Sequence, residues 1–134
     1  MKAFAFLFSD PVRPLEVFSA AALASWAIFL LNVPEALLRD TFSAFDALPA
    51  IWWSVLMAAI VLVQIWAMLP DVRASGFLRF VAMALAAGTW TIVALNFWRA
   101  ATLSTGAGVY SMLALVTTLA GIWLGWVSRN TSAN

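Results

Sequence analysis

The stretch FLRFVAMALAAGTWTIVALNFWR, residues 77–99, decides the fold. Nineteen residues without a formal charge separate Arg79 from Arg99. As an α-helix, these residues span roughly 28 Å, about the thickness of the hydrocarbon layer of a bilayer. The two flanking arginines can extend their guanidinium groups toward the lipid headgroups. The stretch therefore predicts a transmembrane helix rather than a helix buried in a soluble core.

The composition of the whole chain also indicates that the protein lies in a lipid bilayer. Of its 134 residues, 65% are hydrophobic and 10% are charged, and the mean hydropathy is +0.99. Soluble domains are about half apolar and about a quarter charged. A soluble protein this small has too little interior to hide so many apolar side chains. The length indicates a single domain, so we expect one polytopic membrane domain over residues 1–134.

Three further apolar segments have the length of a membrane span. Pro14 suits the first turn of a helix, and Pro34 and Pro70 stop the two segments that precede them. We expect spans at about 15–33, 49–69, 80–98 and 109–127. The expected fold is an all-α integral membrane bundle of four transmembrane helices.

The connection between the first two spans has an amphipathic pattern. Leu38, Phe42 and Phe45 recur at i, i+4 and i+7, while Glu35 and Arg39 form an i,i+4 ion pair on another face. The pattern predicts a short amphipathic helix on the membrane surface. An irregular polar loop is the alternative.

The basic residues are distributed unequally between the two sides of the expected bundle. Lysine and arginine are enriched in cytoplasmic loops of membrane proteins. The side of the two termini carries Lys2, Arg13, Arg73, Arg79 and Arg129, and the other side carries Arg39 and Arg99. We therefore expect both termini to be cytoplasmic.

The residue inventory argues against an enzyme. The chain has no cysteine and no histidine, so the commonest nucleophilic thiol, general base and metal ligand are all missing. The carboxylates fall at the ends of the expected spans or in loops, and no nucleophile–base pair, metal-ligand set or phosphate loop is present. We expect no catalytic residue, no cofactor and no metal. A net charge of +1 gives no reason to expect nucleic-acid binding.

Small and amide side chains in the spans indicate helix packing. An amide in lipid needs a hydrogen-bond partner, so we expect Asn32, Gln64 and Asn96 to face other helices. They would line a wet pore only in an oligomer. Gly121 and Gly125 form a GxxxG motif, which allows close approach of two helix backbones. Three readings stay open for this motif: contact within the chain, contact between chains, and no packing role.

Tryptophan is abundant, with eight residues in the chain. Amphipathic rings prefer the interface between lipid and water. Six tryptophans near span ends are expected to be interface anchors: Trp52, Trp53, Trp66, Trp98, Trp123 and Trp126. Trp26 and Trp90 fall near mid-span, where we expect them to pack in the core.

The opening FSDPVRPLEVFSAAALASWAIFLL, residues 8–31, followed by a proline-marked amphipathic loop and a Trp-rich span, resembles small four-span membrane proteins of tailed-phage and prophage genomes. The resemblance covers the first half of the chain and implies the bacterial inner membrane. Proteins of this kind mostly lack an assigned role. A lysis pore-former (holin) or an envelope factor serving infection is in keeping with it. Typical holins carry a strongly charged C-terminal tail, whereas SRNTSAN here contains one arginine.

These observations give one leading function and two alternatives. The leading hypothesis is a non-enzymatic small inner-membrane protein that acts by helix packing, as an oligomer or as a subunit bound to another membrane protein. A holin-like membrane lesion is the first alternative. The second is a small proton-coupled carrier that uses Glu16, because LEVFSAAAL superficially resembles the glutamate-bearing first span of small multidrug exporters. The third span lacks the glycine-rich packing run expected of those exporters.

Overall fold

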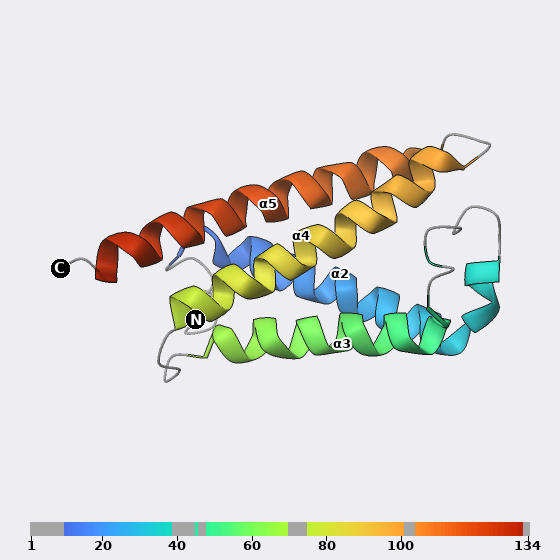
Figure 1. Cartoon of the computed structure of the whole chain (residues 1–134), viewed down its shortest axis with the longest axis horizontal. Coiled ribbons are helices and arrows are strands. Elements are labelled where there is room, and N and C mark those ends of the chain that lie inside the picture. The colour runs from blue at the N-terminus through green and yellow to red at the C-terminus, as the bar shows by residue number, and fades with distance from the viewer. Residues whose placement is uncertain (1–9, 39–44, 46–47, 70–74, 101–103, 133–134) are drawn as a thin grey trace, which may run out of the picture.

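Four long α-helices form an elongated bundle in the computed structural model, which describes residues 10–38, 45, 48–69, 75–100 and 104–132 (Figure 1). The helices are α2 (Arg13–Asn32), α3 (Ala50–Ala67), α4 (Ser75–Arg99) and α5 (Thr105–Ser132). Each is long and apolar enough to cross a membrane. The prediction of an all-α bundle with four membrane helices is confirmed, and the chain is a multi-pass membrane protein. Both α4 and α5 extend beyond the expected spans at each end.

Prolines and one carboxylate define where α2 begins and ends. Pro14 lies in its first turn, where a missing N–H leaves no hydrogen bond unmade. Before the helix, Asp10 Oδ1 accepts a 2.9 Å hydrogen bond from the backbone N–H of Val12. Pro34 follows the last turn and stops the helix. The start of α2 and the end of α5 lie at the same end of the bundle (Figure 1).

The connection after α2 does not show the expected surface helix. Its described part is a short 3-10 helix, η1 (Pro34–Leu38), and the single residue Phe45; the rest of that prediction, at 39–44 and 46–47, lies outside the described residues. Leu37 and Phe45 are buried. Trp53 Nε1 donates to the Phe45 carbonyl oxygen at 3.0 Å, and the two rings meet edge to face at 4.7 Å between centroids. These apolar side chains pack into the end of the bundle because α3 offers them a buried partner.

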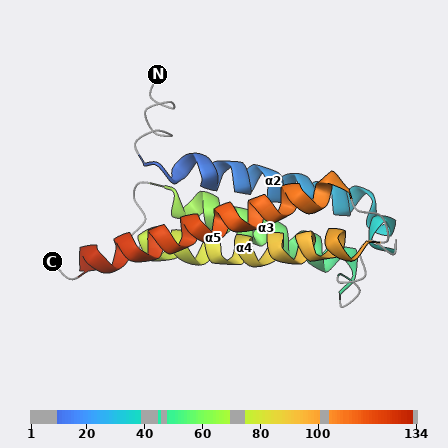
Figure 2. The same ribbon diagram turned by 90° about the horizontal axis from the view of Figure 1, so that it is seen from above.

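Small residues set the packing of the bundle. The closest association is between α4 and α5, which run alongside each other in both views (Figures 1 and 2). Short side chains allow two helix backbones to approach closely in lipid. The buried residues of this kind are Ala82, Ala86, Ala87 and Ala94 on α4 and Ala107, Ala120 and Gly121 on α5. By contrast, α2 packs well on α3 and touches α4 and α5 only sparsely.

The outward face of the bundle is apolar. Phe18 on α2 is 62% exposed, Leu62 on α3 is 67% exposed and Trp126 on α5 is 65% exposed. A soluble monomer rarely shows such a continuous apolar surface. Such a surface is suited to contact with lipid acyl chains.

Candidate functional site

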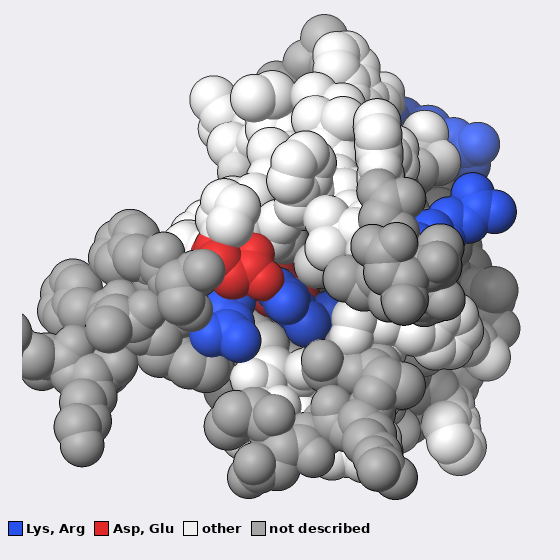
Figure 3. Space-filling view, turned by 90° about the vertical axis from the view of Figure 1, so that its left-hand side faces the viewer, with Lys and Arg blue, Asp and Glu red and all other residues white. Residues whose placement is uncertain are grey.

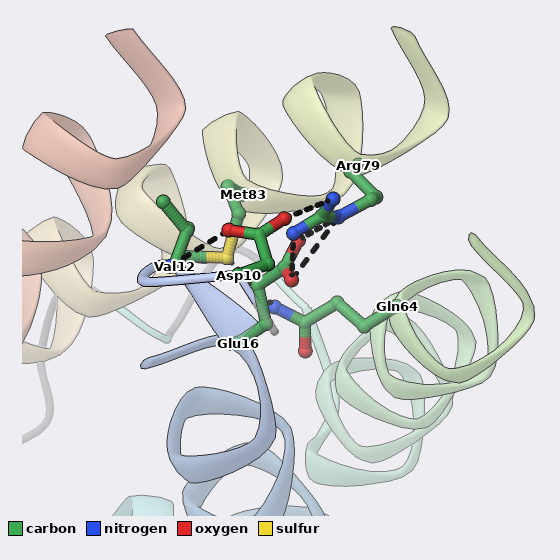
Figure 4. A network of polar contacts seen from close by, with 6 residues as sticks. All are labelled: Asp10, Val12, Glu16, Gln64, Arg79 and Met83. Atoms are coloured by element: carbon green, nitrogen blue, oxygen red, sulfur yellow. Dashed lines mark hydrogen bonds and ion pairs between the residues drawn. The ribbon is translucent and has the colours of Figure 1, made fainter. Parts of the chain in front are cut away.

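One guanidinium and two carboxylates meet at the end of the bundle where α2 begins. Arg79 Nε donates to Glu16 Oε1 at 2.8 Å, and Nη2 donates to Glu16 Oε2 at 2.7 Å. The third nitrogen, Nη1, lies 2.7 Å from Asp10 Oδ2 (Figure 4). The planar guanidinium therefore engages two carboxylates at once, which its rigid fork of donors permits. We call these three residues the Glu16–Arg79–Asp10 network.

The network is buried on one side and open on the other. The Glu16 side chain is 2% exposed, that of Arg79 11% and that of Asp10 25%. Acidic and basic side chains lie side by side at this end of the molecule, among uncharged residues (Figure 3). Ionisable groups at membrane depth usually pair with one another, because an isolated charge there is costly. The pairing neutralises Glu16 and fastens α2 to α4, which otherwise contact each other little.

The outer carboxylate of the network has a lowered pKa. Burial works to raise the pKa of Asp10, but the hydrogen bond from the Val12 N–H and the nearby guanidinium of Arg79 outweigh it. The positive charge of Arg13 adds to the effect. Asp10 is therefore ionised at neutral pH. Together, the formal charges of Asp10, Glu16, Arg79 and Arg13 sum to zero.

An amide from α3 completes the polar end of the bundle. Gln64 is 2% exposed, and its Nε2 donates to Met83 Sδ at 3.4 Å (Figure 4). A thioether is a weak acceptor. Within the described part of the chain, Gln64 Oε1 has no hydrogen-bond partner. The network and this amide together bring polar groups from α2, α3 and α4 to one end. No group of three or more potential metal-ligating residues occurs among the described residues.

A second feature of the bundle is the incomplete contact between its first and last helices. Two hollows of about 910 and 380 Å³ lie between α2 and α5, and a third of about 380 Å³ is lined by α2, α4 and α5. Leu15 and Val116 line both of the first two, so these two hollows adjoin each other. Phe18 and Met112 on the rims are each more than 60% exposed. We call this row of hollows the α2/α5 seam, and it opens toward the lipid.

Aromatic side chains bridge the seam where α2 and α5 diverge (Figure 1). Trp26 Nε1 donates to the hydroxyl oxygen of Tyr110 at 3.2 Å, with the rings edge to face. Trp90 stacks on Tyr110 at 5.8 Å, and Phe97 lies 5.0 Å from it. Trp90 also donates to Ser19 Oγ at 3.3 Å. The tyrosine of α5 is thus held by rings from α2 and α4.

The two glycines of the GxxxG motif lie against α4. An ideal Cβ built on Gly121 would be 3.7 Å from Met83 Cβ, which is ordinary contact. One built on Gly125 would be 3.2 Å from the ring of Phe80, which is tight. The arrangement is the one expected for a packing role within the chain.

The three amides singled out in the sequence have different surroundings. Gln64 is buried between helices, as described above. Asn96 is fully buried and its Nδ2 donates to the Ile92 carbonyl oxygen of its own helix at 2.8 Å. Asn32 is exposed at the end of α2, and its Nδ2 donates to the Ile28 carbonyl oxygen at 2.7 Å. Both asparagines thus donate one hydrogen bond to the preceding turn of their own helix.

Five of the six tryptophans expected at the interface are exposed: Trp52, Trp66, Trp98, Trp123 and Trp126. Trp53 is only 7% exposed, because its ring packs against the Phe45 ring and its N–H donates to the Phe45 carbonyl oxygen. Of the two mid-span tryptophans, Trp90 is fully buried and Trp26 is half-buried.

The partner of Glu16 was not identified from the sequence. Glu16 and Arg79 are 63 positions apart, and each reads as a separate charge at a span end. The topology predicted from lysine and arginine does place Asp10, Glu16 and Arg79 on the same side of the membrane, so the three side chains could have been expected at one end of the bundle. Tyr110 is the one tyrosine of the chain, but nothing in the surrounding sequence indicates that it contacts Trp26 and Trp90.

Comparison with protein-family models, with curated proteins and with solved structures finds no match to this chain.

Proposed function

We propose that this chain is a non-enzymatic protein of a bacterial inner membrane that acts by packing against another membrane chain, either a second copy of itself or a different subunit. The α2/α5 seam is the observation that carries the proposal. In lipid, helices associate through close van der Waals packing and interhelical hydrogen bonds. A row of hollows between two helices leaves such packing incomplete, and a further helix would complete it.

The seam has the dimensions of a helix-binding groove. It is lined by Val12 and α2 as far as Phe29, and by Ser104 and α5 as far as Trp123. The nineteen residues of α5 from Thr105 to Trp123 correspond to roughly 28 Å of helix, close to the full hydrocarbon thickness. A partner helix crossing the membrane beside α2 and α5 would be in contact over most of its length.

The Glu16–Arg79–Asp10 network favours this function over a proton-coupled carrier. A coupling carboxylate has to exchange its partner for a proton or a substrate. Glu16 is 2% exposed and both of its oxygens accept hydrogen bonds from Arg79. Exchange at Glu16 would require an arginine to withdraw from two carboxylates. We therefore assign the network a structural role in holding α2 against α4.

Single-cysteine crosslinking tests the packing proposal directly. The chain contains no cysteine, so an introduced thiol reports its own contacts without background. Met112→Cys places a thiol on the rim of the seam, and Leu62→Cys places one on the outward face of α3 with similar exposure. Oxidation in native membranes should join Met112→Cys to a second copy or to another chain, while Leu62→Cys stays uncrosslinked. Equal crosslinking of the two variants, or none at either, would contradict the proposal.

The orientation we propose places both termini in the cytoplasm, as the distribution of lysine and arginine predicts. A reporter active only in the cytoplasm should be active when fused after Asn134. A reporter active only in the periplasm should be silent there, and its activity would overturn the orientation.

A further inference from the structure

A separate hollow of about 640 Å³ lies between the first turns of α4 and the last turns of α5. Its apolar walls are Phe77 and Phe80 on α4 and Ile122 and Trp126 on α5. Gly125 also lines the hollow, and it lies so near the Phe80 ring that an added Cβ atom would be 3.2 Å from it. We call this space the α4/α5 hollow.

The hollow is apolar toward the bilayer centre and cationic toward the end of the bundle. Ile122, Trp126 and Arg129 follow one another at i, i+4 and i+7 along α5, so they share one face of the helix. Arg129 lies near the end of α5 and is exposed, and Trp126 below it is 65% exposed. Tryptophan and arginine in this arrangement are typical of the headgroup level. A ligand here would meet a cation at one end and apolar side chains below it.

The charge of the hollow favours an anion. Arg129 is the charged residue among the described residues that line the hollow, and none of these residues is a carboxylate. Arg79, the arginine of α4 at this end, is already bound to Glu16 and Asp10. Guanidinium groups recognise phosphate through paired, charge-assisted hydrogen bonds. Basic pockets between membrane helices are a known way of holding anionic lipid headgroups.

The length of the hollow distinguishes a lipid from a helix. Its α5 wall runs over eight residues, from Ile122 to Arg129, or roughly 10 Å. A transmembrane partner helix would pack over a much longer distance, as the α2/α5 seam allows. Docked here, such a helix would also cover Arg129, for which the described lining residues offer no counter-charge. A phospholipid needs only room for the upper part of one acyl chain and a cation at its phosphate.

We propose that the α4/α5 hollow binds one anionic glycerophospholipid, with its phosphate at Arg129 and an acyl chain against Phe80 and Gly125. This lipid site lies on a different face from the α2/α5 seam. It requires no partner chain, so it is independent of the packing function.

Lipid retention measured by native mass spectrometry tests the site. The full chain is reconstituted in equal amounts of phosphatidylglycerol and phosphatidylcholine, released into mild detergent, and the bound lipids are counted. Arg129→Gln removes the cation, and Arg99→Gln removes an exposed arginine at the end of α4 that does not line the hollow. The unmodified chain and Arg99→Gln should retain phosphatidylglycerol preferentially. Arg129→Gln should lower that preference about fivefold, as expected for the loss of one basic residue near an anionic headgroup.

A second variant tests the apolar part of the site. Ile122→Trp adds bulk on an exposed lining residue and should reduce retention of both lipids without changing their ratio. Circular dichroism checks that each variant keeps its helix content. The proposal is overturned if Arg129→Gln and Arg99→Gln show the same lipid preference, or if a well-folded Ile122→Trp variant retains as much of each lipid as the unmodified chain. Displacement of the lipid by inorganic phosphate alone would also overturn it, because the acyl chain would then contribute nothing.

Discussion

Replacing Arg79 by glutamine should destabilise the bundle more than any other single change in its charged network. The substitution leaves Glu16, which is 2% exposed, and Asp10, which is 25% exposed, as two carboxylates without the guanidinium that joins them. Removing one partner of a buried ion pair typically costs about 3–5 kcal/mol, because the remaining charge stays desolvated. We expect Arg79→Gln to lower the free energy of unfolding by an amount in this range.

The other two positions should follow in a defined order. Glu16→Gln leaves Arg79 paired with Asp10 at 2.7 Å, so the cation keeps a partner and the loss should be roughly 1–3 kcal/mol. Asp10→Asn removes the most exposed member and should cost about 1 kcal/mol or less. The double variant Arg79→Gln with Glu16→Gln should be more stable than Arg79→Gln alone, because it removes the unpaired buried charge.

Reversible unfolding in mixed micelles, followed by helical circular dichroism, gives the free energies for this comparison. Arg99→Gln is the matched control, since Arg99 is exposed at the opposite end of α4. If Arg79→Gln costs no more than Arg99→Gln, the ion pair contributes nothing to stability and the structural role assigned to it is wrong. A double variant less stable than Arg79→Gln would refute the argument from an unpaired carboxylate.

Three further predictions concern the ends and the interface of the bundle. The pKa of Asp10 is lower in the folded chain than in the unfolded chain, where an aspartate has a pKa of about 3.9. Its contribution to the free energy of unfolding is therefore present above that pH and is lost as the pH falls through the folded pKa. In Asp10→Asn, the free energy of unfolding should depend less steeply on pH in this acidic range. Gly125→Ala should cost about 1 kcal/mol or more, since its Cβ meets the Phe80 ring at 3.2 Å, whereas Gly121→Ala, with 3.7 Å available, should be nearly neutral in the same unfolding assay. Trp53→Phe should cost about 0.5–1.5 kcal/mol, the net contribution of one hydrogen bond, because the Phe45 carbonyl oxygen loses the 3.0 Å bond from the indole N–H but keeps the 3.3 Å bond from the Leu48 N–H.

The membrane helices could be predicted from the sequence because the thickness of the bilayer sets the length of each uncharged segment, and no tertiary contact is needed to recognise it. An uncharged stretch such as 80–98 has to cross the hydrocarbon layer as a helix, whatever its neighbours are. Prolines such as Pro34 then mark where the helices end. The connection between α2 and α3 did not follow a rule of this kind. Its periodicity indicates an amphipathic helix, but the packing of Phe45 depends on Trp53, and that contact is tertiary.

The charged network illustrates what a single sequence does not contain. Glu16 and Arg79 each lie near a span end, where a lone charge can reach the headgroups and needs no partner. Only the relative rotation of α2 and α4 turns both side chains inward toward each other. That rotation depends on the shapes of many apolar side chains, such as Met83 beside Gln64, and no local pattern records it.

The positions of the strong and weak contacts suggest how the bundle can accept a partner without losing its fold. Polar groups of α2 and α4 are joined at one end by Glu16 and Arg79, and near the other end Tyr110 links α5 to rings of α2 and α4. Between these two connections, α2 and α5 are separated by apolar hollows. A helix entering this seam would displace lipid rather than protein contacts. The hydrogen bonds and ion pairs that hold the four helices together would stay intact, so binding and folding can be separated in this chain.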